Sequence, residues 1–410
     1  MMWMNVCVVL AANQMQPTPT PTPVPMPVPQ PVPGALLPAE RPAAVSPAQA
    51  VSQERLMKAV EALPTKRATG PTDEHVQGLL KTQEWLAARL RDLGYRPKLI
   101  KIGFKLRDGP AQPEWQNIEV EIPGREEAEK VLLIGAHFDS HPDAPGADDN
   151  GTGVAAVLEL ARVLQNVPMR RTVRLVLFNL EERAGNSGLH GSTQYATVVA
   201  EAVRAGEIDL IGMLSLEMLG YYSDEPGSQQ NPFEKLNIPG FEMPDRGDFI
   251  GLGTTLPNRA LVRGLAAAMR EAEPKVKVVV FDYAPVPTPD LMRSDHAPFL
   301  LQGLPGVIVT DTANFRNPHY HQPSDTVATL DAARFTITVR ALAGAIHQLA
   351  GPIGEQERWP LRPVFDPGKG GAPPTHLPDS QPRKPALPKP VVPKPLVPTE
   401  PGDKGPKVPG

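Results

Sequence analysis

The sequence predicts an α/β fold in which a mostly parallel, mixed central sheet is covered by helices on both faces, giving three layers. Short apolar runs that are typical of buried strands alternate along the chain with segments whose apolar residues recur at helical spacing. Strands that are buried on both faces are continuously apolar, so this alternation favours a parallel sheet between two helical layers. Polar residues follow several of these strands directly, where open α/β sheets place their functional sites.

The first half of the folded body begins with helical spacing and continues with strands. Helices are predicted over 52–62, 72–93, 153–165 and 188–204, and strands over 97–104, 117–122, 130–136 and 172–179. Gly94 follows the last apolar residue of the second helix and is its expected stop. The first two strands are expected to pair with each other.

The second half repeats the alternation after one interruption. Strands are predicted over 208–217, 276–282 and 305–310, and helices over 256–271, 295–301 and 329–350. Residues 221–253 are rich in Pro, Gly, Asp and Asn and predict a long irregular loop. The tripeptide RGD lies in this loop, but it is too common to indicate adhesion.

Proline marks both ends of the chain. Residues 16–33 read QPTPTPTPVPMPVPQPVP, and residues 360–410 carry repeated Lys-Pro pairs, both typical of polyproline II. Neither end has enough apolar surface to fold. We therefore predict disordered ends over 1–49 and 353–410 and a folded body over 50–352.

Composition limits the class of function. The chain has 410 residues and a net charge of −4, which gives no electrostatic footprint for nucleic acid. Its single cysteine, Cys7, excludes an intrachain disulfide and a cysteine metal site. The first twelve residues are apolar, like an export signal that lacks its positive region, so we expect an exported protein. No later segment has the roughly 18 apolar residues that span a bilayer.

The loop between the strand at 130–136 and the next helix concentrates ionisable side chains. They are His137, Asp139, His141, Asp143, Asp148 and Asp149. Burying so many charges without partners is costly, and a divalent metal is the simplest partner. From this loop alone, a solvated acidic loop is an equally good explanation.

Three further strands lead into residues that can bind metal. These residues are Glu181 and Glu182, Glu217, and His319 and His321. Each glutamate taken singly is more typical of a solvated loop, but the carboxyl ends of parallel strands meet at one edge of a sheet. Nitrogen and oxygen donors without sulfur suit zinc. Five ligands plus one spare carboxylate suit two metals that share a carboxylate, with the spare group as general base.

Five segments in this order resemble the co-catalytic di-zinc aminopeptidase family, metallo-exopeptidases that include secreted bacterial leucine aminopeptidases and glutamate carboxypeptidase-like proteins. The segments are AHFDS with GADDNGTG, NLEE with GS, SLEMLGY, RSDHAPF and NPHYHQPSDT. The resemblance covers about residues 70–345. It implies a zinc-exopeptidase-like fold, two Zn²⁺ per chain and release of N-terminal residues from peptides.

The resemblance also implies a role for individual residues. His137 and Glu217 would bind one zinc, Glu182 and His321 the other, and Asp148 would bridge both. Glu181 would be the general base, and Tyr320 would donate to the tetrahedral intermediate.

Four residues would support the site. Asp139 would orient His137, Arg293 would contact substrate, and Asp295 would support the site from within the protein. Asp149 would form the second half of a cis bond with Asp148. His141 and Asp143 are expected at the rim.

This sequence departs from the better-known members at Glu217, where they have Asp, which shifts the donor by one methylene. A carboxypeptidase or a glutaminyl-cyclase-like enzyme on the same scaffold, and a non-catalytic binding module, stay open as alternatives. A complete ligand set argues against the binding module. Side-chain specificity and oligomeric state are not given by the sequence.

Overall fold

The computed structural model describes residues 45–105, 113–182, 184, 187–231, 242–284 and 289–353. The predicted export signal and most of both proline-rich ends lie outside these residues. No helix within the described ranges is long and apolar enough to cross a membrane.

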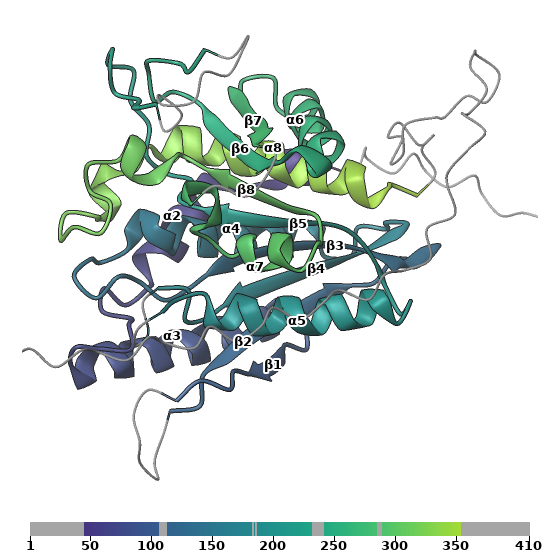
Figure 1. Cartoon of the computed structure of the whole chain (residues 1–410), viewed down its shortest axis with the longest axis horizontal. Helices are drawn as coiled ribbons and strands as arrows, with labels where there is room; N and C mark the ends of the chain where they lie inside the picture. The colour runs from purple at the N-terminus through teal and green to yellow at the C-terminus, as the bar shows by residue number, and fades with distance from the viewer. Residues whose placement is uncertain are drawn as a thin grey trace, which may run out of the picture. The chain divides into compact units, whose positions relative to one another are not determined.

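The described residues form an eight-stranded mixed sheet in the order β1-β2-β4-β3-β5-β8-β6-β7 (Figure 1). The strands are β1 (Lys98–Lys101), β2 (Gln116–Ile122), β3 (Glu127–His137), β4 (Arg171–Phe178), β5 (Asp209–Glu217), β6 (Ile250–Thr255), β7 (Val278–Ala284) and β8 (Gly306–Thr310). The central strands β4, β3, β5 and β8 are parallel, whereas β1, β2 and β4 pair antiparallel, as do β8 and β6. The predicted mostly parallel mixed sheet is therefore confirmed.

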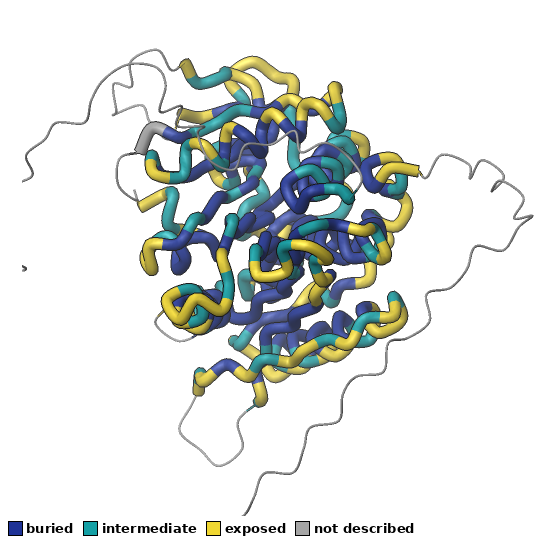
Figure 2. The backbone as a smooth tube through the Cα atoms, turned by 90° about the vertical axis from the view of Figure 1, so that its right-hand side faces the viewer, coloured by how far each residue is buried: buried dark blue, intermediate teal, exposed yellow. Residues whose placement is uncertain are grey.

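Helices cover both faces of this sheet (Figure 1). They are α1 (Pro47–Ala50), α2 (Gln53–Glu61), α3 (Asp73–Asp92), α4 (Gly153–Leu164), α5 (His190–Arg204), α6 (Arg259–Ala272), α7 (Ala297–Leu301) and α8 (Ala332–Ala350). Leu132 and Ile134 of β3 pack in the core with α4 and α8, whereas Val131 and Leu133 pack on the other face with α5 and α7. Successive strand residues point to opposite faces, and residues 131–134 are all buried, so both faces of β3 are covered. Figure 2 shows buried residues, in dark blue, running through the interior of the described fold.

Local sequence explains where most elements begin and end. The helix predicted over 72–93 is α3, and Gly94 follows it with a φ of +87°, a conformation that glycine adopts without strain. The predicted pairing of the first two strands is confirmed by β1 and β2.

The prediction of an irregular loop over 221–253 is wrong at its end. Residues Ile250–Thr255 form β6 between β8 and β7. The sequence IGLGTT contains two glycines, which have low strand propensity, so pairing within the sheet decides its structure.

The register of the central strands brings their carboxyl ends to one edge. His137 at the end of β3 is paired with Phe178 at the end of β4, and Glu217 at the end of β5 is paired with Thr310 of β8. Segments that follow these strands therefore start side by side.

Candidate metal centre

Two clusters of possible metal ligands lie at this edge of the sheet. His137, Glu181 and Glu217 form one cluster, and Asp149, Glu182 and His321 form the other. Within each cluster, one ligand atom from every residue lies within 4.8 Å of those of the others. Residues from four separate segments thus meet as their strand-end positions predicted.

Asp149 belongs to the second cluster and also contacts His137 of the first. Its Oδ1 is 3.4 Å from Nε2 of His137, and its Oδ2 is 3.2 Å from Nε2 of His321. Asp149 is buried, so both oxygens are held towards these imidazoles and away from solvent. A carboxylate in this place can share its two oxygens between two metals.

Asp148, to which the family resemblance gives the bridging position, is not among the clustered ligand residues. Its carboxylate accepts hydrogen bonds from the backbone N–H of Gly220 (2.8 Å) and from Nδ2 of Asn317 (2.8 Å). The cis peptide bond is also one residue later than expected, at Asp149–Asn150. Two adjacent aspartates cannot be told apart by composition, so the sequence alone did not indicate which of them joins the cluster.

The predicted orienting residue Asp139 contacts the backbone of the two glutamates and the imidazole of His137. Its two carboxylate oxygens accept from the backbone N–H groups of Glu181 (3.1 Å) and Glu182 (3.0 Å). Its Oδ1 is also 3.6 Å from Nδ1 of His137. One carboxylate therefore fixes the segment that carries both glutamates and lies beside the imidazole.

Glu217 is held by side chains that the sequence analysis did not single out. Its Oε2 accepts from the hydroxyl of Ser294 (2.7 Å) and from Nδ2 of Asn150 (3.4 Å), and lies 3.3 Å from Nε2 of His137. Both residues lie inside segments that resemble the aminopeptidase family, but serine and asparagine carry no ligand signal of their own.

Electrostatics at the centre favour a bound cation. Burial and the nearby carboxylate of Asp149 raise the pKa of Glu182 to about 7, and burial raises the pKa of Glu181 well above its usual value. Burial opposes protonation of His321, but Asp149 and Glu182 raise its pKa to about 10. Four carboxylates and two imidazoles, without sulfur, form a donor set that fits zinc.

The imidazole of His321 is stacked between two rings. Tyr320 lies 3.8 Å from it on one side and His141 lies 4.2 Å from it on the other, measured between ring centroids. Asp143, the other expected rim residue, has a side chain that is 74% exposed.

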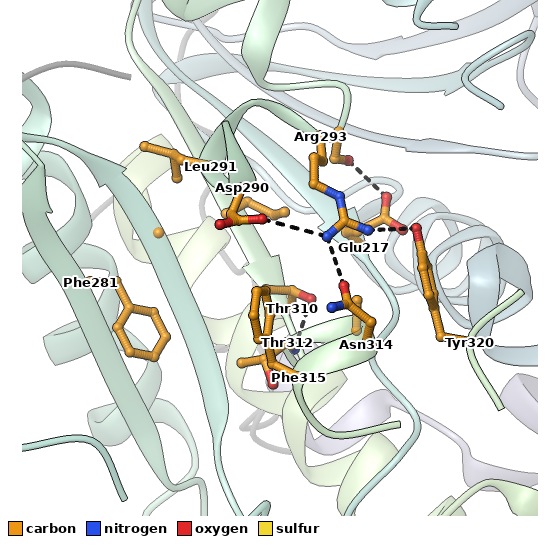
Figure 3. Close-up of a pocket in the computed structure, with 14 residues that line it drawn as sticks. Glu217, Phe281, Asp290, Leu291, Arg293, Thr310, Thr312, Asn314, Phe315 and Tyr320 are labelled. Atoms are coloured by element: carbon orange, nitrogen blue, oxygen red, sulfur yellow. Dashed lines mark hydrogen bonds and ion pairs between the residues drawn. The ribbon is translucent and has the colours of Figure 1, made fainter. Parts of the chain in front are cut away.

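Arg293 connects Tyr320 to Asn314 by two hydrogen bonds. It donates from Nη2 to the Tyr320 hydroxyl (2.8 Å) and from Nη1 to Oδ1 of Asn314 (2.7 Å), as Figure 3 shows. The predicted substrate-contacting arginine is thus at the centre, next to the predicted tyrosine.

Asp295 is fully buried beside the centre. Burial raises its pKa to about 7, while the charge of His137 opposes this shift. Its neighbour His296 is also buried, and burial lowers its pKa to about 3. Neither side chain is among the clustered ligand atoms.

Two cavities adjoin the metal centre. The first, about 330 Å³, is lined by Glu181, Glu182, Asp149, His321 and Tyr320 among others. The second, about 110 Å³, extends from Glu217, Arg293 and Tyr320 to an apolar wall (Figure 3). That wall includes Phe281, Leu291, Ile308 and Phe315. These residues come from β7, β8 and two short 3₁₀ turns, so the sequence offered no spacing that would group them.

Most of the residues that form the sheet and the two clusters match a known protein family. The family model described as "Peptidase family M28" matches residues 117–346. YfbL of Escherichia coli (strain K12) is 35% identical over 210 residues, which cover 49% of this chain and 61% of YfbL. The "Probable lipoprotein aminopeptidase LpqL" of Mycobacterium tuberculosis is 30% identical over 248 residues, covering 55% of this chain and 44% of LpqL.

A solved structure shares the fold. The LapA aminopeptidase of Legionella pneumophila superposes with a TM-score of 0.55 at 21% identity, covering 75% of this chain and 72% of LapA. The chain spans less than two thirds of the length of YfbL and LpqL.

Proposed function

The chain belongs to peptidase family M28, and on this premise we propose that it is a zinc-dependent aminopeptidase that binds two Zn²⁺. The observation that supports this most is Asp149, whose two oxygens face His137 and His321 in two separate ligand clusters. His137 and Glu217 would hold one metal, Glu182 and His321 the other, and Asp149 would touch both.

Glu181, which is not a metal ligand in this assignment, would transfer protons. When bound, zinc would lower the pKa of a water and polarise the substrate carbonyl. Glu181 is not needed as a ligand in this assignment, and its side chain is only about 10% exposed. Because burial raises its pKa, Glu181 can accept a proton from water and return it to the leaving amine.

Tyr320 is prepared to donate a hydrogen bond to substrate. Arg293 has no acceptor atoms, so the Tyr320 oxygen must accept in their 2.8 Å hydrogen bond. The phenolic proton is then free to point into the cavity that Tyr320 lines. A donor in this position would stabilise negative charge that develops on the carbonyl oxygen of the substrate.

The two cavities suit two groups of an N-terminal residue, its α-ammonium group and its side chain. Carboxylates of the 330 Å³ cavity would attract an α-ammonium group, and the apolar wall of the 110 Å³ cavity would take its side chain. A cavity of about 150 Å³ holds a benzene ring. The smaller volume therefore favours branched aliphatic side chains such as leucine over large aromatic ones.

A substrate panel tests this function. The zinc-loaded protein is assayed with leucine amide, its N-acetylated form, peptides that end in glutamate and peptides that begin with glutamine. We expect hydrolysis of leucine amide and none of the N-acetylated form. Release of C-terminal glutamate would instead favour a carboxypeptidase, and ring closure of N-terminal glutamine with one zinc per chain would favour a cyclase.

Export is a second part of the proposal. The apolar first twelve residues and the lipoprotein named among the relatives both support it. Fractionation of cells that express the full chain tests this location, and recovery only from the cytoplasm would contradict it.

A further inference from the structure

Arg67 lies outside the segment that matches the family model, yet its guanidinium contacts the loop between two proposed metal ligands, His137 and Asp149. It belongs to the link between α2 and α3 and is only 1% exposed. It donates from Nε to the carbonyl of Phe138 (2.9 Å), from Nη1 to that of Pro145 (2.5 Å) and from Nη2 to that of Gly146 (2.5 Å). All three carbonyls belong to the loop 138–149, which joins His137 to Asp149.

This burial needs an explanation, because a charged guanidinium loses its hydration inside a protein. Among the described residues, Arg67 forms no ion pair, and its hydrogen bonds go to backbone carbonyls. Burial lowers its pKa to about 10, and the negative charges of Asp325 and Asp149 oppose this shift. Arg67 therefore stays cationic at neutral pH while its donors fix the backbone.

The loop is shaped around the guanidinium at Gly146. This residue has a φ of +70°, and a Cβ built on it would lie 2.5 Å from the backbone oxygen of Asp149 and 2.7 Å from Nη2 of Arg67. Any larger residue would therefore press against the guanidinium while adopting a strained backbone.

A second residue, Asp325, binds N–H groups of the same loop. The carboxylate of Asp325 accepts from the backbone N–H of Asp148 (2.9 Å) and of Asp149 (3.2 Å). Arg67 thus binds carbonyls and Asp325 binds amides of one loop, whose ends carry His137 and Asp149.

We propose that Arg67 is a positioning residue that holds the loop 138–149 in the conformation that presents His137 and Asp149 to metal before the metal binds. The inference rests on the metal centre of the proposed function. In this inference, the planar set of N–H donors of the guanidinium holds the loop, and its positive charge alone would not. A lysine would keep the charge but could not reach three carbonyls in one plane.

Two substitutions distinguish the effect of the guanidinium donor geometry from the effect of its positive charge. Arg67→Lys keeps the charge and Arg67→Met removes it, and Arg171→Lys serves as the matched control. Arg171 is equally buried, at 2% exposure, but lies at the start of β4, at the opposite end of that strand from the metal centre. Zinc affinity is measured by competition with a chromophoric chelator, and hydrogen exchange of the loop amides is measured in metal-free protein.

Both Arg67 variants should bind zinc about 10- to 100-fold more weakly, the range typical of residues that orient metal ligands. Their loop amides should exchange faster without metal, whereas Arg171→Lys should keep the zinc affinity of the natural chain. Gly146→Ala would press both on Nη2 of Arg67 and on the backbone oxygen of Asp149, so it tests the same loop and should also weaken zinc binding. This variant keeps the inference testable if either Arg67 variant fails to fold.

Unchanged zinc affinity in Arg67→Lys or in Gly146→Ala would overturn the inference. Tighter zinc binding by Arg67→Met alone would also overturn it, since it would mean that charge repulsion dominates. Zinc binding is measured without peptide, so a protein that binds zinc but lacks peptidase activity would contradict only the proposed function. Absence of zinc binding in the natural chain would contradict both.

Discussion

The hydroxyl of Ser294 donates a 2.7 Å hydrogen bond to Oε2 of Glu217. This contact bears on Glu217, where the family resemblance leads us to expect an aspartate, because it holds the longer glutamate side chain. Ser215, in turn, lies 3.0 Å from Ser294 between their hydroxyl oxygens and does not bond to Glu217.

Ser294→Ala should therefore weaken zinc binding and lower kcat/KM for leucine amide, each by roughly tenfold, because Glu217 loses its orienting donor. Ser215→Ala is the matched control and should have a much smaller effect. Competition with a chelator and steady-state kinetics measure the two quantities. If Ser294→Ala matches the natural chain in both, Glu217 does not need this contact.

Asp149 and Asp148 should respond differently to loss of charge. Asp149→Asn should remove most zinc, because the carboxylate that faces both His137 and His321 loses its charge. Asp148→Asn should keep its zinc but melt at a lower temperature, since Asp148 accepts buried hydrogen bonds from Gly220 and Asn317. Metal analysis and thermal unfolding of the two variants test the assignment, which the opposite pattern of zinc loss would reverse.

Leu291 should limit the size of the side chain that the 110 Å³ cavity accepts. Leu291→Ala enlarges this cavity, so we expect kcat/KM for phenylalanine amide, relative to leucine amide, to rise by about tenfold or more. Leu301→Ala is a control because that leucine is 74% exposed and does not line the cavity. An unchanged ratio in Leu291→Ala would place the side-chain pocket elsewhere.

His296 should make the protein sensitive to acid. Its folded-state pKa of about 3 lies below the usual value of 6.5, so the unfolded chain binds a proton more readily between these values. Stability from this group is present above pH 6.5 and is lost as pH falls towards 3. Urea unfolding with a chelator at pH 7 and pH 5 should show a smaller loss for His296→Gln than for the natural chain. Equal losses would mean that His296 does not contribute.

The sequence predicted the sheet and the meeting of most candidate ligands at one edge, because both depend on regular patterns. Apolar runs located seven of the eight strands, and only β6, with its glycines, depended on pairing with distant strands. Ligands such as His137 and Glu217 end strands, so the topology alone brings them together. Asp148 and Asp149 are adjacent residues of the same type, so residue spacing does not indicate which of them joins the cluster.

Contacts made through the backbone were also missed. Arg67 binds backbone carbonyl groups, which every residue has, so no residue type in the sequence indicates its partners. The cavity wall joins Phe281, Leu291 and Ile308, whose apolar side chains would suit any core position.

Glu181→Gln tests the central claim most directly, measured by zinc content and kcat on leucine amide, with Glu182→Gln beside it. We predict that Glu181→Gln retains two zinc ions while kcat falls by roughly 10²- to 10⁴-fold, because proton transfer is lost but no ligand is. Glu182→Gln should instead lose zinc, since Glu182 Oε1 lies 3.2 Å from His321 in a ligand cluster. Retained zinc with undiminished activity in Glu181→Gln would contradict its role as general base.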